Sequence, residues 1–258
     1  MNDDDLKRRK AEGHKVLLVL ETEFNAKPRT AILSIQGSQI RALAQFPSVI
    51  QNYPYSMIIN TAILKLADWF RHGNNVVRMH IYKVFKGISE QHLVKIINID
   101  ETVRRIIPVL GSNDPISRAF TLRTLGCMAS IIADNLDVQH GLLQCLQKAT
   151  NQFEIEAAIW ASDRFCSYST TFLSVMFTRI YVKLNDPSVS NDIQLRLIRI
   201  LRHMHSDITM ARQAKQLCLM ILDQQKANEE FVIVVLRTLT MLLSVALLDQ
   251  QEQVGHQY

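Results

Sequence analysis

Apolar residues recur at helical spacing along most of the chain, and a polar start signal comes before each apolar run. In Ser112–Ile132, Asp114 can accept a hydrogen bond from a first-turn N–H, and Pro115 suits the first helical position. From Ile116 onward, apolar residues are mostly three and four positions apart. The pattern predicts one helix in Ser112–Ile132 that other elements cover on two sides.

The same kind of start recurs along the chain. Similar starts stand at Gly73, Thr150, Ser190 and Ala227. When the first four of these repeated segments are aligned, one position is occupied by Arg78, Arg118, Glu156 and Arg196. These residues are separated by intervals of 40, 38 and 40 residues. A second helix fits before or between the starts, in Ser56–Phe70, Asp100–Leu110, Val138–Lys148, Thr171–Leu184 and Ile208–Gln225.

Two helices per roughly 40 residues is the period of HEAT and armadillo repeats. One hairpin cannot bury its apolar face alone, whereas stacked hairpins share a continuous core. Three nearly equal intervals argue against the alternative, an irregular all-α domain. The sequence therefore predicts an all-α fold, a right-handed α-solenoid of HEAT/armadillo-like repeats with about five helical hairpins.

The repeat pattern covers residues 37–248, and we expect different structure at each end. Residues 1–36 do not follow the pattern, because Lys15–Phe24 fits a strand as well as a short buried helix. We predict an irregular N-terminal arm or an imperfect cap there. Residues 249–258 are polar and predict a tail that frays.

The most apolar stretch is Phe231–Leu248. It barely reaches membrane-spanning length, and Arg237 near its centre would cost about 2.5–3.5 kcal/mol on insertion. We interpret it as the last repeat helix and expect no membrane partner. Because no polar capping helix follows it, we expect either that a partner covers it or that the chain is part of a longer one.

Composition agrees with long helices in a reducing compartment. Only 8 Gly and 6 Pro occur in 258 residues, fewer than a β-sandwich or barrel normally needs for its turns. The four cysteines have no C-x-x-C spacing, so a zinc ribbon is disfavoured. Each lies in an apolar helical pattern, which predicts buried thiols. The first residues lack the apolar core of a secretory signal.

A net charge of +5 permits an acidic partner without requiring one. Several basic residues predict a partner face that meets phosphates or an acidic protein. They are Arg196, Arg199 and Arg202 on one helix, together with Arg118 and Lys83, and with Lys86 and Arg123 beside them. The alternative is an ordinary solvated helix face, because charge runs usually face water.

Two further groups have both a functional and a structural interpretation. Lys7, Arg8, Arg9 and Lys10 form a short basic cluster that resembles a nuclear import signal, or simply a solvated start. Trp69 and Trp160 fit the core of the repeats, or a contact that dominates binding of a partner.

Catalytic motifs do not stand out. The sequence contains no G-x-S-x-G, H-E-x-x-H or Walker glycine loop. His203 and His205 are two residues apart, so on a helix they point in opposite directions and cannot share a metal. We expect no catalytic, cofactor-binding or metal-binding residues, and therefore no enzyme.

Several long segments resemble the N-terminal region of the Integrator complex subunit 7 family. They are Phe46–Val84, Ile96–Ile106, Gly111–Ile132, Glu154–Phe165 and Leu195–Asp207. The resemblance implies a nuclear, helical-repeat scaffold without catalytic activity, in a complex that acts with RNA polymerase II. It also implies a role in small nuclear RNA 3′-end processing and in transcription attenuation. Members of the family are much longer than this chain.

The expected function is therefore a nuclear scaffold that binds other Integrator subunits, and through them RNA polymerase II machinery. We expect the nucleus as its location, with the cytoplasm as a second compartment. Two alternatives remain: a nucleic-acid-binding helical-repeat module, and a cytosolic transport adaptor of the same solenoid class.

Overall fold

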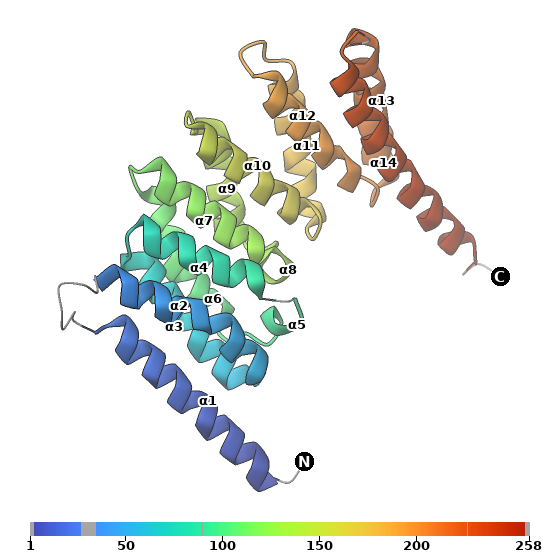
Figure 1. Ribbon diagram of the computed structural model, residues 1–258. Helices are drawn as coiled ribbons and strands as arrows, with labels where there is room; N and C mark the ends of the chain where they lie inside the picture. The colour runs from blue at the N-terminus through green and yellow to red at the C-terminus, as the bar shows by residue number, and fades with distance from the viewer. Residues whose placement is uncertain (1–2, 27–34, 89, 226, 256–258) are drawn as a thin grey trace. The chain divides into compact units, whose positions relative to one another are not determined.

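The computed structural model describes residues 3–26, 35–88, 90–225 and 227–255, and this part of the chain is helical without strands (Figure 1). Its α-helices are α1 Asp3–Phe24, α2 Ile35–Asn52, α3 Ser56–His72, α4 Asn75–Gly87, α5 Glu90–Leu93, α6 Ile99–Ile106, α7 Pro115–Cys127, α8 Ala129–Ile132, α9 Leu136–Lys148, α10 Gln152–Cys166, α11 Thr170–Leu184, α12 Asn191–Ile200, α13 Ile208–Gln224 and α14 Glu229–Gly255. Two 3₁₀ helices, η1 Ile107–Gly111 and η2 Leu201–His203, extend α6 and α12.

Side-chain caps start many of these helices. Asp114 accepts hydrogen bonds from the backbone N–H groups of Ile116 and Ser117, and Pro115 occupies the first helical position. Asn74 caps α4 in the same way, by accepting from the N–H of Val77. These bonds satisfy donors that a helix leaves free at its start. The predicted cap and proline at the start of α7 are confirmed.

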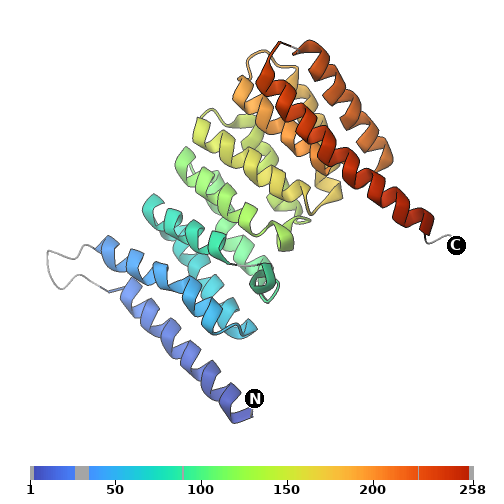
Figure 2. The same ribbon diagram turned by 45° about the vertical axis from the view of Figure 1, so that its right-hand side comes forward.

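The chain divides into two compact units, residues 1–161 and 162–258. In the first unit, α2, α4 and α7 lie side by side in one layer, and α3 and α6 lie in the other (Figures 1 and 2). Apolar side chains from both layers are fully buried between them, among them Phe46, Ile63 and Ile81. This stacking of helical hairpins confirms the predicted all-α repeat fold.

In the second unit, α13 and α14 pack against each other, and α12 packs against both α11 and α14. Phe172, Ile198, Cys218 and Val235 are completely buried among these helices. The single predicted repeat domain over residues 37–248 therefore contains parts of two units. The boundary falls inside α10, where sequence periodicity continues without interruption.

The predicted irregular arm over residues 1–36 is wrong for its described part, because Asp3–Phe24 is a regular helix. Helix α1 packs against α2 and α3 and buries Leu17 and Leu20. The Phe24 ring stacks on the Trp69 ring with centroids 3.8 Å apart. These contacts with α2 and α3 select the helix where periodicity alone was ambiguous. Residues 27–34 lie outside the described residues.

Two other boundaries differ from the prediction. The helix predicted over Ser112–Ile132 ends at Cys127 as α7, and the short α8 follows from Ala129. At the C-terminal end, the backbone of α14 continues as a helix to Gly255. The polar tail predicted over residues 249–258 is thus helical in its described part, residues 249–255, and residues 256–258 lie outside the described part. Polarity alone does not end a helix whose backbone bonds are already formed.

Candidate interaction surfaces

Polar side chains join α4 to α7 at the point where both helices begin. Asn75 Nδ2 donates to Asp114 Oδ2 at 2.6 Å, and Arg78 Nη1 donates to Ser117 Oγ at 2.9 Å. Arg78 also donates through Nε to the carbonyl oxygen of Phe70, at 3.0 Å, near the end of α3. The two bonds from Asn75 and Ser117 are the largest causes that lower the pKa of Asp114 to about 2. Arg78 thus links three helices.

Arg118 plays the same role between α7 and α10. Its Nε and Nη2 donate to the two carboxylate oxygens of Glu154, each at 2.6 Å, and its Nη1 donates to the carbonyl oxygen of Ser112 at 2.7 Å. Glu154 is only 1% exposed. This paired geometry raises the pKa of Arg118, with the hydrogen bond to Glu154 as the largest cause. Arg118 was predicted in a basic partner face, but its guanidinium is engaged within the fold.

The caps also correct the repeat alignment. Arg78 and Arg118 are each the fourth residue after their N-cap, Asn74 and Asp114. Asn151 caps α10, so the equivalent residue there is Ile155 rather than Glu156. Ser190 precedes α12, so the equivalent there is Gln194 rather than Arg196. The predicted alignment of Glu156 and Arg196 is wrong because intervals counted between starts do not account for loop length.

In the second unit, Asp163 near the end of α10 holds two side chains from η2. Its carboxylate accepts from Arg202 Nη2 at 2.8 and 2.6 Å, and His203 Nε2 lies 3.0 Å from Oδ1. Arg196 pairs within its own helix, with Nε 2.9 Å from Asp192 Oδ2. Of the three arginines predicted on one helix of the basic partner face, only Arg199 is exposed without an ion pair in the described part of the chain.

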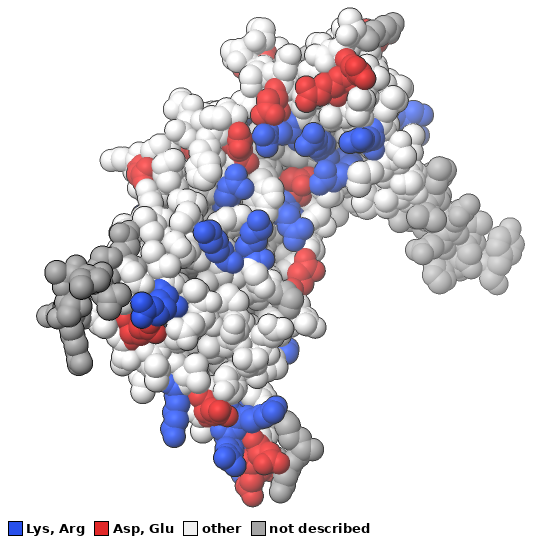
Figure 3. Space-filling model, in the orientation of Figure 1, with Lys and Arg blue, Asp and Glu red and all other residues white. Residues whose placement is uncertain are grey.

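In the first unit, α4 and α7 carry cations that no described carboxylate balances. Lys83 and Lys86 are exposed, and Arg123 is half-buried. Figure 3 shows Lys and Arg side chains gathered over these two helices. The guanidinium carbon of Arg123 lies 5.4 Å from the ring centroid of Phe153 and 5.9 Å from that of Trp160. The sequence pointed to Trp160 and Arg123 separately, but not to their contact.

The last helix of the second unit presents an apolar stripe to solvent. Phe231, Val235 and Leu242 are buried on one side of α14. Ile233, Leu236 and Leu243 are exposed along one side of α14 and form this stripe, whereas Met241 is exposed on the other flank of the helix. An exposed apolar stripe of this kind marks a surface that another element can cover. It supports the expected partner surface within Phe231–Leu248.

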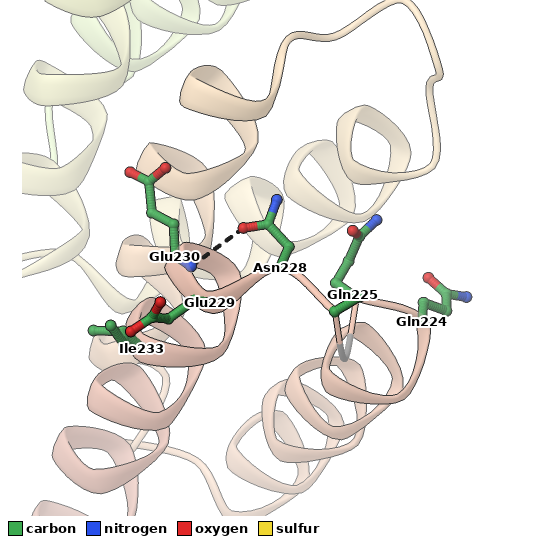
Figure 4. A pocket seen from close by; sticks show the side chains of 7 residues that line it. Gln224, Gln225, Asn228, Glu229, Glu230 and Ile233 are labelled. Atoms are coloured by element: carbon green, nitrogen blue, oxygen red, sulfur yellow. Dashed lines mark hydrogen bonds between the residues drawn. The ribbon is translucent and has the colours of Figure 1, made fainter.

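A hollow of about 610 Å³ lies beside this stripe, where α13 ends and α14 begins. Figure 4 shows Gln224, Gln225, Glu229 and Glu230 around it, with Ile233 at its edge. Asn228 Oδ1 accepts from the backbone N–H of Glu230 at 3.2 Å and so caps α14. Amides and carboxylates of this kind suit polar contacts at the rim of a protein interface.

The basic cluster at the start of the chain lies on α1. Lys7 pairs with Asp3 one turn earlier, with 2.9 Å between Nζ and Oδ2. Arg8 and Arg9 are exposed, and Lys10 Nζ lies 5.8 Å from the ring centroid of Tyr55. The cluster is therefore helical, with its four side chains on different sides of α1.

The thiols are mostly part of the core. Burial raises the pKa of Cys145 to about 11 and that of Cys218 to about 12, and it raises the pKa of Cys166 as well. These three thiols stay protonated near neutral pH and pack as small apolar groups. The prediction of four buried thiols is wrong for Cys127, which is partly exposed.

Within the described residues, no group of three or more His, Cys, Asp and Glu side chains is placed to hold a metal ion. The described helices include none with the length and hydropathy of a membrane span.

Comparison with known proteins identifies the family. A sequence model described as "Integrator complex subunit 7, N-terminal" matches residues 34–256. The chain belongs to the Integrator complex subunit 7 family. The matched residues include α4, α7, α12 and α14, whereas the basic cluster on α1 lies outside them.

Relatives named Integrator complex subunit 7 occur in distant animals. The protein from Homo sapiens is 41% identical over 218 residues, which are 84% of this chain and 22% of the relative. That from Drosophila melanogaster is 35% identical over 243 residues, 94% of this chain and 23% of the relative. The chain therefore spans less than a quarter of the length of these relatives.

Solved structures show the same fold. An engineered protein from the Northeast Structural Genomics Consortium has a TM-score of 0.60 at 16% identity, covering 89% of this chain and 97% of its own. A designed armadillo repeat protein in complex with the peptide (KR)4 has a TM-score of 0.60 at 13% identity, covering 88% and 98%. At these identities the likeness concerns the fold alone, and it agrees with the predicted armadillo-like solenoid.

Proposed function

We propose that this chain is a non-catalytic scaffold segment of the nuclear Integrator complex. The match of residues 34–256 to the family carries the proposal. In this role the chain binds other Integrator subunits through the exposed faces of its repeats. Through them it supports small nuclear RNA 3′-end processing and attenuation of transcription by RNA polymerase II.

Buried and half-buried polar side chains link one helix to another within the fold, which supports a scaffold function. The arginines Arg78, Arg118 and Arg202 connect one helix of the array to another. Such bonds hold stacked repeats in register and leave the outer faces of the helices for partners. The apolar stripe of α14 is the exposed face best suited to a protein, because burying it removes aliphatic surface from water.

Affinity purification of the tagged chain from nuclear extract, followed by mass spectrometry, tests the proposal. We expect other Integrator subunits to be recovered. The double variant Leu236→Lys/Leu243→Lys, at side chains 50% and 38% exposed, should reduce this recovery. Leu219→Lys on α13, at a side chain 48% exposed, is the matched control and should not. Recovery of chaperones alone by the unaltered chain would contradict the proposal.

Nuclear import is tested separately at α1. Alanine at Lys7, Arg8, Arg9 and Lys10 should lower the nuclear fraction of a fluorescent fusion of this chain, because import receptors read exposed basic clusters. Alanine at Lys15 and Arg41, two exposed cations outside the cluster, is the control. An unchanged nuclear fraction would show that the cluster is not an import signal.

A further inference from the structure

Helices α4 and α7 have an excess of positive charge that the fold does not neutralise. Neither helix contains Asp or Glu, and together they contain Arg78, Lys83, Lys86, Arg118 and Arg123. Arg78 and Arg118 are engaged in the bonds between helices. Lys83, Lys86 and Arg123 have no ion pair among the described residues, so their charges are available to a ligand.

The register of the two helices brings these cations together. The bonds from Asn75 to Asp114 and from Arg78 to Ser117 align the starts of α4 and α7. Counted from the two N-caps, Lys83 and Arg123 both occupy the ninth position. Because the helices pack side by side, these residues stand on neighbouring helix axes about 8–10 Å apart. Lys86, one turn after Lys83, extends the same patch.

Arg123 is held in place before any ligand arrives. Phe153 and Trp160 of α10 contact the guanidinium, at 5.4 and 5.9 Å from their ring centroids. Its Nε is buried and has no hydrogen-bond partner within the described structure. The two Nη groups are therefore the part that can reach a ligand. A planar guanidinium fixed in this way suits a carboxylate, which can accept two parallel hydrogen bonds.

We propose that the face formed by Lys83, Lys86 and Arg123 docks an acidic segment of a partner protein, rich in Asp and Glu. The proposal rests on the proposed scaffold function and adds the chemistry of one partner. One carboxylate of the segment pairs with Arg123, and neighbouring carboxylates meet Lys83 and Lys86. Charge complementarity of this kind gives specificity and fast association.

A protein segment fits this face better than RNA does. Single-stranded nucleic acid is held largely by stacking of bases on exposed aromatic rings. Here the guanidinium of Arg123 already contacts Trp160 and Phe153, which restricts access of a base to these rings. Three cations also release few counterions, so RNA binding would be weak at physiological salt.

The test is fluorescence anisotropy with the 258-residue chain and a short fluorescein-labelled peptide of alternating Glu and Ser. We expect Lys83→Glu and Arg123→Glu each to weaken binding by about tenfold or more. Arg123→Lys, which keeps the charge but loses the planar fork, should cause a smaller loss. Lys15→Glu makes the same charge change at an exposed lysine of α1 and should leave the affinity nearly unchanged.

Controls keep the outcome decisive. Lys83 is exposed, so Lys83→Glu tests the surface even if Arg123→Glu unfolds the chain. Equal binding by Lys83→Glu and the unaltered chain, or an equal loss in Lys15→Glu, would overturn the proposal. Tighter binding of a labelled oligouridine, weakened by the same variants, would assign the face to RNA instead. If Integrator subunits are still recovered while the acidic peptide does not bind, only this inference fails.

Discussion

The two units use side-chain bonds at opposite ends of their helices to hold neighbouring repeats together. In the first unit, Arg78 and Arg118 near the starts of α4 and α7 reach forward to the start of the next helix. In the second unit, the corresponding Gln194 donates only to the loop before its own helix, at Val189 O. There the link between helices lies at their ends, where Arg202 and Asp163 pair.

Helix α10 carries both kinds of link, with Glu154 near its start and Asp163 near its end. The change of pattern falls on the helix in which the boundary between the units lies. Repeats of similar length therefore need not be held together by the same contacts. The Arg118–Glu154 pair of the first unit includes a buried carboxylate, whereas both partners of the Arg202–Asp163 pair are partly exposed. The loss in the free energy of unfolding when a pair is broken should therefore be larger in the first unit.

The largest effect is expected at the buried pair of the first unit. Glu154→Gln leaves Arg118 half-buried without its counter-charge, and we expect the free energy of unfolding to fall by about 3–5 kcal/mol. Urea unfolding followed by circular dichroism measures it. Asp163→Asn in the second unit, where both partners are partly exposed, is the matched variant and should lose less. Equal losses would remove the energetic distinction between the two units.

A smaller effect is expected where α7 and α10 approach closely. A Cβ at Gly126 would lie 2.5 Å from Trp160 Cζ3 and 3.2 Å from the Cα of Ala161. Gly126→Ala must therefore displace the Trp160 ring and shift the α10 backbone slightly, and we expect a loss of about 1–3 kcal/mol. At Gly87, nothing lies within 4 Å of an added Cβ, so Gly87→Ala should be close to neutral. The midpoint of thermal unfolding, measured for both variants, shows whether the contact between α7 and α10 leaves no room for an added methyl group.

The cap of α7 should contribute less than the packing at Gly126. Asp114→Ala removes the cap bonds from the N–H groups of Ile116 and Ser117 and also the bond from Asn75 of α4, so we expect a loss of about 2 kcal/mol. Ser190 makes no side-chain cap bond before α12, so Ser190→Ala in the second unit should cost less. A larger loss for Ser190→Ala would contradict the assigned caps.

The contribution of the Asp114 carboxylate to the free energy of unfolding should depend on pH. The folded pKa of Asp114 is about 2, below the ordinary value of 3.8. A lowered folded pKa means that the stabilisation is fully present above the ordinary value and disappears as pH falls from about 4 toward 2. Asp114→Asn retains a good cap but does not titrate, so the stability difference from the unaltered chain should shrink over this range. Urea midpoints measured at each pH test the sign.

The smallest effect is expected for the exposed pair on α12. Arg196→Ala removes its bond to Asp192, four residues earlier on the same helix. Pairs of this kind contribute about 0.3–0.5 kcal/mol and are screened by salt. The loss should therefore be small and should decrease as salt is added. A loss comparable to that of Glu154→Gln would mean that Arg196 also holds the fold together.

The helices could be predicted well because their signals are local. The apolar spacing of three and four residues and the polar caps belong to the segment that folds, so α3, α9 and α11 fall within two residues of the predicted bounds. Helix α1 was not predicted because the pattern of Lys15–Phe24 fits a strand equally well, and only packing, such as that of Phe24 on Trp69, selects the helix.

The candidate site could be predicted only as a group of residue types. Arg118, Arg123 and Arg199 look alike in the sequence, yet Glu154 neutralises the first, Phe153 and Trp160 hold the second, and the third is exposed. Arg118 and Glu154 are 36 positions apart, so their pairing depends on how two repeats stack. The 40-residue interval that aligns Arg78 with Arg118 also aligns Lys83 with Arg123, but which of the aligned cations stays without an ion pair depends on how the repeats stack.

The sequence by itself determined the helical class, the repeat length of about 40 residues and the family, because local backbone preferences and segment similarity need no knowledge of distant contacts. Tertiary structure decided which cations remain available, where the two units divide and that the start of the chain is a helix. Each of these depends on side chains that are far apart along the chain and meet only when the helices stack, since burial and pairing are properties of the packed array.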